Sequence, residues 1–156
     1  MEINILINEN MEIELGWDWL RQIAEKVLVR ENAPQNAELS LLITGQDKIQ
    51  ELNRIYRGKD RPTDVLSFCM SSGQSSEDIF IEPPDGLTHL GEVIISYPQA
   101  ELQAKEAKHS IQREIAGLIV HGVLHILGYD HEADEMATAM QAKEREILTE
   151  LKEIIP

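Results

Sequence analysis

The stretch that decides the fold is an apolar segment carrying three histidines, His121-Gly122-Val123-Leu124-His125-Ile126-Leu127-Gly128-Tyr129-Asp130-His131. Its histidines occupy relative positions 0, 4 and 10, and the first two lie in an apolar run that predicts a helix. Residues four apart on a helix share one face, offset by about 40° and roughly 6 Å apart along the axis. Two imidazoles placed in this way can bind one metal ion. Gly128 can adopt the left-handed conformation that ends a helix, so the following turn can bring His131 to the same ion.

Three imidazoles with a fourth position left to water form the ligand set of a catalytic zinc site. We therefore predict one Zn²⁺ per chain, held by His121, His125 and His131, although nickel or copper could also bind three imidazoles. A histidine on an apolar helix is more often a hydrogen-bonded core residue. Burying two of them side by side without partners would be costly, however, and this favours the metal site.

The spacing matches the metzincin metalloprotease pattern H-E-x-x-H-x-x-G-x-x-H in its three histidines and its glycine. The glutamate that acts as general base in those proteases is replaced here by Gly122, which can neither accept nor return a proton. The sequence thus predicts the ligands of such a protease without its base. A metal ion can lower the pKa of a bound water to about 7, so the metal alone could still activate a nucleophile.

Two further motifs accompany the histidine segment. The first is Tyr56-Arg57-Gly58-Lys59-Asp60-Arg61-Pro62-Thr63-Asp64-Val65-Leu66-Ser67-Phe68, and the second is Leu90-Gly91-Glu92-Val93-Ile94-Ile95. Over roughly residues 38 to 150, the three segments resemble in order and spacing the signatures of the YbeY family of bacterial endoribonucleases. That family usually carries Asp where Glu92 stands and Pro where Cys69 stands.

The resemblance implies a zinc-dependent endoribonuclease directed at single-stranded RNA, acting at the 3′ end of the small-subunit (16S) ribosomal RNA and in ribosome quality control. It also implies a zincin-like fold, with the metal helix beneath a small mixed sheet and a cleft along the sheet edge. Arg57 would be the catalytic arginine, able to hold a phosphate oxygen through paired hydrogen bonds, and Lys59 and Arg61 would steer RNA phosphates. The implied partners are single-stranded or ribosomal RNA and the small ribosomal subunit or a basic ribosomal protein, with no DNA and no membrane.

The charge of the chain opposes general nucleic-acid affinity. Its net charge is −14, from 14 basic and 28 acidic residues, whereas such affinity comes from phosphate neutralisation by Lys and Arg. One dense basic cluster exists, formed by Arg54, Arg57, Lys59 and Arg61. By composition alone it indicates a solvated helix end, where cations favour the helix dipole; the family resemblance favours RNA binding instead. The acidic residues outside this cluster are complementary in charge to a basic protein partner.

Length and composition predict one cytoplasmic domain over residues 1–156. A single cysteine, Cys69, excludes an intrachain disulfide and fits a reducing compartment. Residues 1–4 lack the basic leader of a secretory signal, and the apolar helix around His121 is too short to span a membrane.

Hydrophobic periodicity predicts an α+β domain with four strands and about five helices. The strands are expected at 2–8, 38–44, 64–70 and 90–96, with helices at 17–30, 46–57, 97–108 and, after the capping residue Ser110, through the histidine segment. A last helix is expected from about Asp130, with core positions Met136, Met140, Ile147, Leu151 and Ile154. Trp17 and Trp19 are expected in the core, and residues 71–89 in a long loop.

Two other functions stay open. A metalloprotease is favoured by the ligand spacing and the acidity but opposed by Gly122. A non-catalytic ribosome-assembly factor with a structural zinc would need a fourth protein ligand. Cys69 lies more than fifty residues from His121, although the fold could bring it close. Asp130 could either cap the last helix or accept a hydrogen bond from a ligand histidine.

Overall fold

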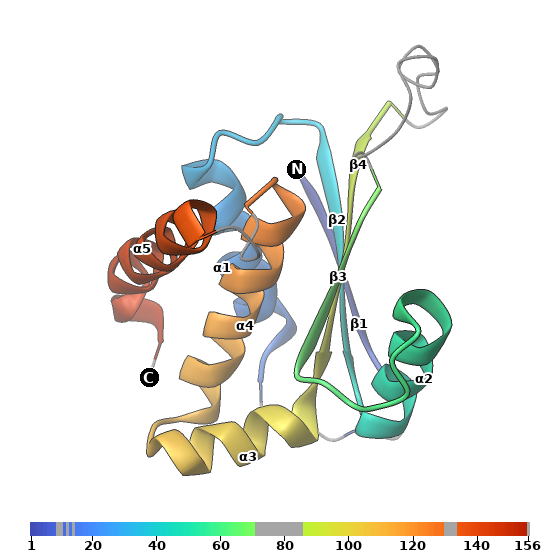
Figure 1. Cartoon of the computed structure of the whole chain (residues 1–156). Helices are drawn as coiled ribbons and strands as arrows, with labels where there is room; N and C mark the ends of the chain where they lie inside the picture. Colours follow the sequence, from blue (N-terminus) through green and yellow to red (C-terminus); the bar gives the residue numbers. More distant parts are fainter. Residues whose placement is uncertain (9–10, 12, 14, 71–85, 130–133, 156) are drawn as a thin grey trace.

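A four-stranded sheet with helices on both faces forms the molecule (Figure 1). The structure is a computed structural model that describes residues 1–8, 11, 13, 15–70, 86–129 and 134–155. Its elements in chain order are β1 Glu2–Ile7, α1 Trp17–Arg30, β2 Ala37–Thr44, α2 Gln46–Arg57, β3 Val65–Cys69, β4 Thr88–Ser96, α3 Tyr97–Ala107, α4 Ile111–Ile126, α5 Asp134–Glu150 and the 3₁₀ turn η2 Lys152–Ile154. Within these ranges the predicted α+β class, with four strands and five α-helices, is confirmed.

The sheet is mixed, with strand order β1-β2-β4-β3. β1, β2 and β4 are parallel, and β3 pairs antiparallel with β4 at one edge. Side chains alternate across the sheet, so Ser67 and its register partner Val93 face α4 while Phe68 and its partner Glu92 face the side of α2. The motifs at 56–68 and 90–95 are therefore neighbours in space as adjacent strands.

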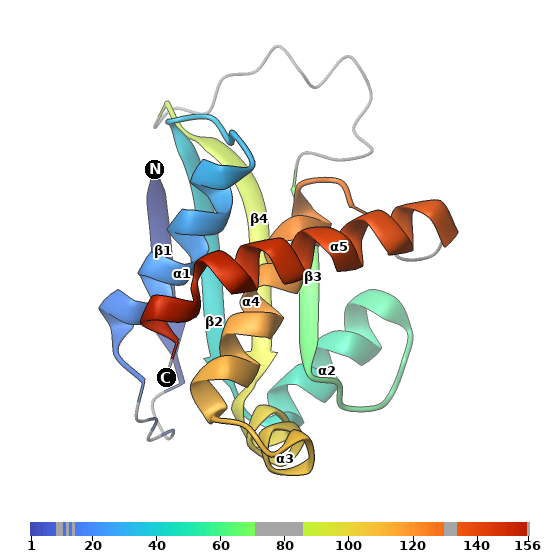
Figure 2. The ribbon, with the colours of Figure 1, turned by 90° about the vertical axis from the view of Figure 1, so that its left-hand side faces the viewer.

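Helix α4 lies at the centre of the core. Its apolar side chains pack against the sheet and α1, and α5 crosses it on the outer side (Figure 2). The fully buried members include Ile115, Ile119, Val120, Val123 and Leu124. A helix that is apolar almost all round is a buried one, and this position follows from the sequence. None of the described helices has the length and apolarity needed to cross a membrane.

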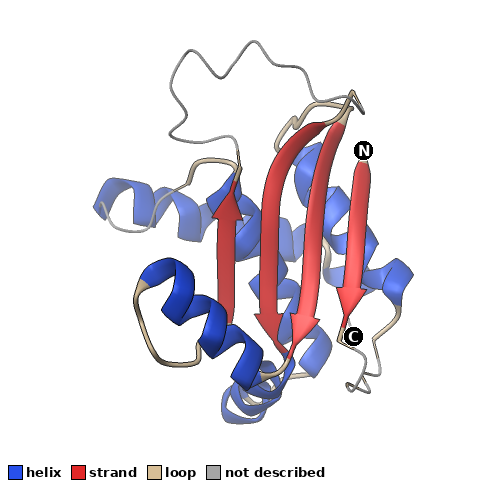
Figure 3. Ribbon diagram, turned by 90° about the vertical axis from the view of Figure 1, so that its right-hand side faces the viewer, coloured by secondary structure: helices blue, strands red, loops and turns tan. Residues whose placement is uncertain are grey.

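The opposite face of the sheet carries a smaller cluster. Ile49 of α2 packs on Leu66 and Ile94, and α2 covers only one end of this face (Figure 3). Gly58 ends α2 in the left-handed conformation, with φ of 69°, as a glycine at this position is expected to do. The chain then turns directly into the basic residues Lys59 and Arg61.

Gly91 is required for the pairing of β3 with β4. Its φ is 151°, and a Cβ at this position would lie 2.0 Å from the carbonyl oxygen of Phe68. Only a residue without a side chain allows the two strands to approach in this way. The close approach of β3 thus explains why the 90–95 motif has a glycine at position 91.

Some expectations were wrong in detail. Trp17 is 51% exposed, because it stands in the first turn of α1 and the buried stripe of that helix begins at Leu20. Met136 is 39% exposed, because the first turns of α5 extend beyond α4 (Figure 2). β4 begins at Thr88, so His89 belongs to a strand and not to the preceding loop. Trp19 does pack on the core, and residues 71–85 lie outside the described ranges.

Candidate metal centre

His121 and His125 share one face of α4, as their spacing predicted. Their ring centroids are 6.0 Å apart. Both side chains are half-buried, whereas the intervening residues 122–124 are buried. The pair therefore lies on a partly accessible strip of this central helix.

The helix ends where the sequence indicated. Gly128 has φ of 111°, its N–H donates to the carbonyl of His125 at 3.1 Å, and the N–H of Tyr129 donates to Leu124 at 3.1 Å. The third predicted ligand, His131, and its neighbour Asp130 lie outside the described residues. Among the residues that are described, no three His, Cys, Asp or Glu side chains form a group that could hold a metal.

Sequence reasoning missed Glu144. Its Oε1 lies 2.6 Å from Nδ1 of His121, and the side chain is 24% exposed. The hydrogen bond to Glu144 raises the pKa of His121, and the nearby charges of Glu144 and Asp64 add to this effect while burial opposes it. A proton and a metal ion compete for an imidazole, so metal binding here should weaken as pH falls.

Gly122 is packed against the sheet. A Cβ at this position would lie 2.7 Å from Cγ1 of Val93 and 3.2 Å from Oγ of Ser67. The hydroxyl of Ser67 also donates to the carbonyl of Gly122 at 3.3 Å. The position that holds the general base in metzincins is therefore closed here by the neighbouring strands and has no room for a carboxylate.

Gly122→Ala should destabilise the protein by about 1–3 kcal/mol, because the added methyl group overpacks the contact with Val93. Gly117→Ala is the matched control on the same helix, since a Cβ there meets nothing within 4 Å. It should stabilise α4 by about 0.5–1 kcal/mol through backbone entropy. Urea unfolding of the two variants measures the difference. If both variants unfold at the same denaturant concentration, Gly122 is not closed in by Val93.

Arg57 reaches from the end of α2 to β3. Its Nη2 donates to the carbonyl oxygen of Ser67 at 2.8 Å, and its Cζ lies 5.8 Å from the centroid of the Phe68 ring. Ser67 in turn contacts Gly122, the residue next to His121. The fold thus connects the predicted catalytic arginine to the histidine helix through a single residue, and the side chain of Arg57 remains exposed.

The other cations of the cluster lie on the surface. Arg54, Lys59 and Arg61 are exposed, and none of their side chains pairs with a described carboxylate. The turn that carries Lys59 and Arg61 is held by buried Asn53, whose Nδ2 donates to the carbonyl of Arg61 at 2.9 Å. These charges are free to meet an anionic ligand, and they also stand where cations favour the dipole of α2.

Cys69 lies close to the histidine helix despite its distance in sequence. Its Sγ donates to the carbonyl oxygen of Ile126 at 3.4 Å.

Tyr129 donates its hydroxyl proton to Glu31 at 2.8 Å, and this hydrogen bond raises the pKa of the phenol. Tyr129 therefore packs against the core in the turn after α4.

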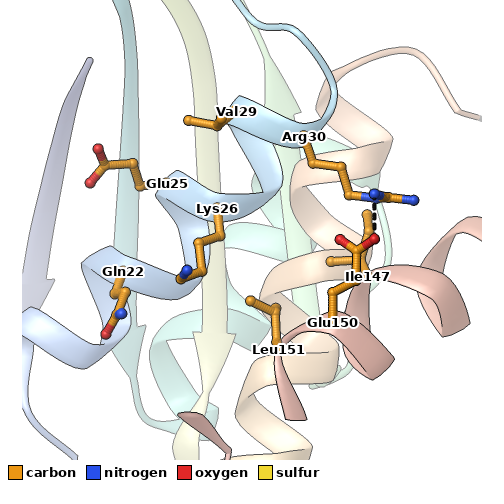
Figure 4. Close-up of a pocket in the computed structure, with 8 residues that line it drawn as sticks. All are labelled: Gln22, Glu25, Lys26, Val29, Arg30, Ile147, Glu150 and Leu151. Atoms are coloured by element: carbon orange, nitrogen blue, oxygen red, sulfur yellow. Dashed lines mark hydrogen bonds and ion pairs between the residues drawn. The ribbon is translucent and has the colours of Figure 1, made fainter. Parts of the chain in front are cut away.

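A separate groove runs between α1 and α5 (Figure 4). It contains none of the predicted functional residues; its lining residues are Gln22, Glu25, Lys26, Val29, Arg30, Ile147, Glu150 and Leu151. Arg30 pairs with Glu150 at 2.6 Å across it and with Glu146 at 3.1 Å. The groove thus marks the interface between α1 and α5, which these ion pairs hold together.

Comparison with known proteins places this architecture in one class. The family model described as Endoribonuclease YbeY matches residues 4–152. The chain is 46% identical over 159 residues to the Endoribonuclease YbeY of Dehalococcoides mccartyi, covering 99% of this chain and 92% of that protein. It is 46% identical over 130 residues to that of Geobacillus thermodenitrificans, covering 83% of each. The solution structure of TM1509 from Thermotoga maritima matches with a TM-score of 0.57 and 28% identity, over 97% of this chain and 92% of that one.

These matches define a family of endoribonucleases. The chain belongs to the YbeY family. The resemblance inferred from the three sequence motifs is confirmed by a match that extends over nearly the whole chain.

Proposed function

We propose that this chain is a metal-dependent endoribonuclease that cleaves single-stranded RNA, in maturation of the small-subunit ribosomal RNA 3′ end and in ribosome quality control. The observation that carries the proposal is that His121 and His125 lie on one accessible face of α4. Arg57 is close to them, because it donates a hydrogen bond to Ser67 of β3, the strand that packs on α4. Family membership supports ribonuclease activity. We also propose that the metal site is zincin-like and that the enzyme acts in the cytoplasm.

The residues present fit a transition metal. His121 donates through Nδ1 to Glu144, so Nε2 is the unprotonated nitrogen of the neutral ring and has the lone pair that a metal requires. The ring of His125 lies on the same face, with its centroid 6.0 Å from that of His121. His131 would complete the set from the segment that follows. Zinc is the first choice for three imidazoles, and nickel is a possible replacement. A metal held there would supply Lewis-acid polarisation of a phosphodiester oxygen or of water.

Arg57 is the residue that we assign to the phosphate. Its guanidinium has five donors, and the hydrogen bond to Ser67 uses only part of them. Packing beside Phe68 and the bond to β3 hold the group in place, so little side-chain entropy is lost when an anion binds. The remaining donors can stabilise charge that grows on the phosphate in the transition state. Lys59 and Arg61 would contact neighbouring phosphates of the RNA strand.

The general base is not Gly122, and the packing of this residue leaves no room for a carboxylate variant. This argues against peptide hydrolysis by the metzincin route. The second candidate function is a ribosome-assembly factor with a structural zinc. One observation favours it, because Cys69 approaches the end of α4 and could supply a fourth ligand.

The test is a side-by-side incubation of zinc-loaded protein with single-stranded RNA and with casein. RNA should be cut, and casein should stay intact because Gly122 cannot act as a base. A chelator and His121→Ala should each abolish the RNA cleavage. Cleaved casein that disappears with the chelator would instead support the protease. Tight zinc binding with neither substrate cut would support the assembly factor.

A further inference from the structure

Glu144 breaks the pattern of its own helix. The buried stripe of α5 runs through Met140 and Ile147 and continues at Leu151, directly after the helix; these residues are 1%, 1% and 4% exposed. Spacings of four, three and four residues place position 144 on this stripe. A carboxylate in the middle of an apolar stripe is costly to bury without a partner. Local exceptions of this kind are expected at functional positions.

The partner of Glu144 is His121. The two atoms, Oε1 and Nδ1, are 2.6 Å apart, and the side chains are 24% and 35% exposed. A carboxylate accepts hydrogen bonds and does not donate them, so Nδ1 of the imidazole must carry the hydrogen. Nε2 is then the unprotonated nitrogen in the neutral ring. The contact therefore determines both the tautomer and the orientation of the histidine.

The rest of α5 is fixed so that Glu144 keeps this position. Arg30 of α1 pairs with Glu150 (Figure 4) and with Glu146 at one side of the helix. Lys143 lies 3.7 Å from Glu31 at the end of α1. Tyr129 donates to the same Glu31, which connects α1 to the turn after α4. The carboxylate of Glu144 is thus presented by a helix that is anchored independently of the histidine.

We propose that Glu144 is the positioning residue of His121: it holds the imidazole in the Nδ1–H tautomer and orients Nε2 toward the metal. This inference rests on the proposed metal site. It adds a residue from α5, outside the three sequence motifs, to the machinery of the centre. The carboxylate acts through His121 and does not touch the substrate.

The test measures zinc affinity by competition with a chelator. Glu144→Ala should weaken zinc binding about 10–100-fold, the usual cost of losing an outer partner of a ligand histidine. Glu144→Gln keeps an acceptor oxygen without the charge, so its loss should be smaller. Glu150→Gln is the matched control, since it removes a carboxylate that also makes a 2.6 Å contact from α5, to Arg30 instead of a histidine. It should leave zinc affinity unchanged, because the Arg30–Glu146 and Lys143–Glu31 pairs still anchor α5.

A second readout needs no metal. In ¹⁵N spectra of the metal-free protein, at a pH where the ring is neutral, His121 should be the Nδ1–H tautomer. Glu144→Ala should shift it toward the Nε2–H form, and Glu150→Gln should not. Equal losses of zinc affinity in Glu144→Gln and Glu150→Gln, or an unchanged tautomer in Glu144→Ala, would overturn the positioning role. Wild-type protein that binds no zinc would overturn the proposed metal site itself, whatever the tautomer.

Discussion

His125→Ala should strip the protein of most of its bound metal and of its RNA cleavage. The residue is one of three predicted ligands, and its imidazole lies on the accessible strip of α4 beside His121. Removing a ligand should cost more than the about 10–100-fold in affinity that loss of an outer partner costs. The fold should survive, because the core contacts of α4 come from its other faces. Elemental analysis of the purified variant gives the metal content, and circular dichroism checks the fold.

His109→Ala is the matched control for this experiment. His109 precedes the same helix and lies outside the predicted ligand spacing, and its Nε2 is 2.8 Å from Oε1 of Glu114. This substitution should leave the metal content at the wild-type value. Full metal occupancy in His125→Ala, or an equal loss in both variants, would contradict the ligand assignment.

Cys69→Ala decides between an open and a closed metal site. If three histidines and a water hold the metal, removing the thiol near Ile126 should change neither metal content nor RNA cleavage. A clear loss of metal in this variant would identify a fourth protein ligand. The proximity of Cys69 to the end of α4 would then count as ligation, and the structural-zinc alternative would be favoured.

The sequence predicted the parts of this centre that depend on local geometry. His121 and His125 share a face because four residues nearly complete a helical turn, and Gly128 ends the helix because glycine tolerates positive φ. Similar local rules gave the four strands, the helix at 17–30 and the cap at Ser110, whose Oγ accepts from the N–H of Arg113 at 3.1 Å.

The contacts that depend on tertiary packing were not predicted. Glu144 meets His121 only because α5 crosses α4, and no local pattern gives that crossing. A signal was nevertheless present, since the apolar stripe of the last helix has an acidic residue between Met140 and Ile147. The orientation of Glu92 is a comparable case: only the register opposite Phe68 shows that its side chain lies on the face away from α4.

Arg57→Glu should impair RNA cleavage by about 10²–10³, because loss of a charge-assisted hydrogen bond to a developing oxyanion typically costs that much in rate. Metal content should stay unchanged, since Arg57 meets Ser67 and Phe68 and not the histidines. Arg57→Lys keeps the charge but loses the planar fork, so its rate should lie between those of wild type and Arg57→Glu. Single-turnover cleavage of a short single-stranded RNA measures all three.

Lys152→Glu makes the same charge inversion at the same type of exposed surface, in η2, which follows α5. It controls for the net charge of −14, which repels RNA from the whole molecule. RNA affinity of the wild type should also fall as salt rises, because phosphate contacts release counterions. If the basic cluster is only a solvent-exposed end of α2, Arg57→Glu and Lys152→Glu should have equally small effects, with the cleavage rate of both variants within a few fold of wild type. That result would remove Arg57 from the catalytic machinery, because a residue that stabilises the transition state must affect the rate far more than a distant charge does.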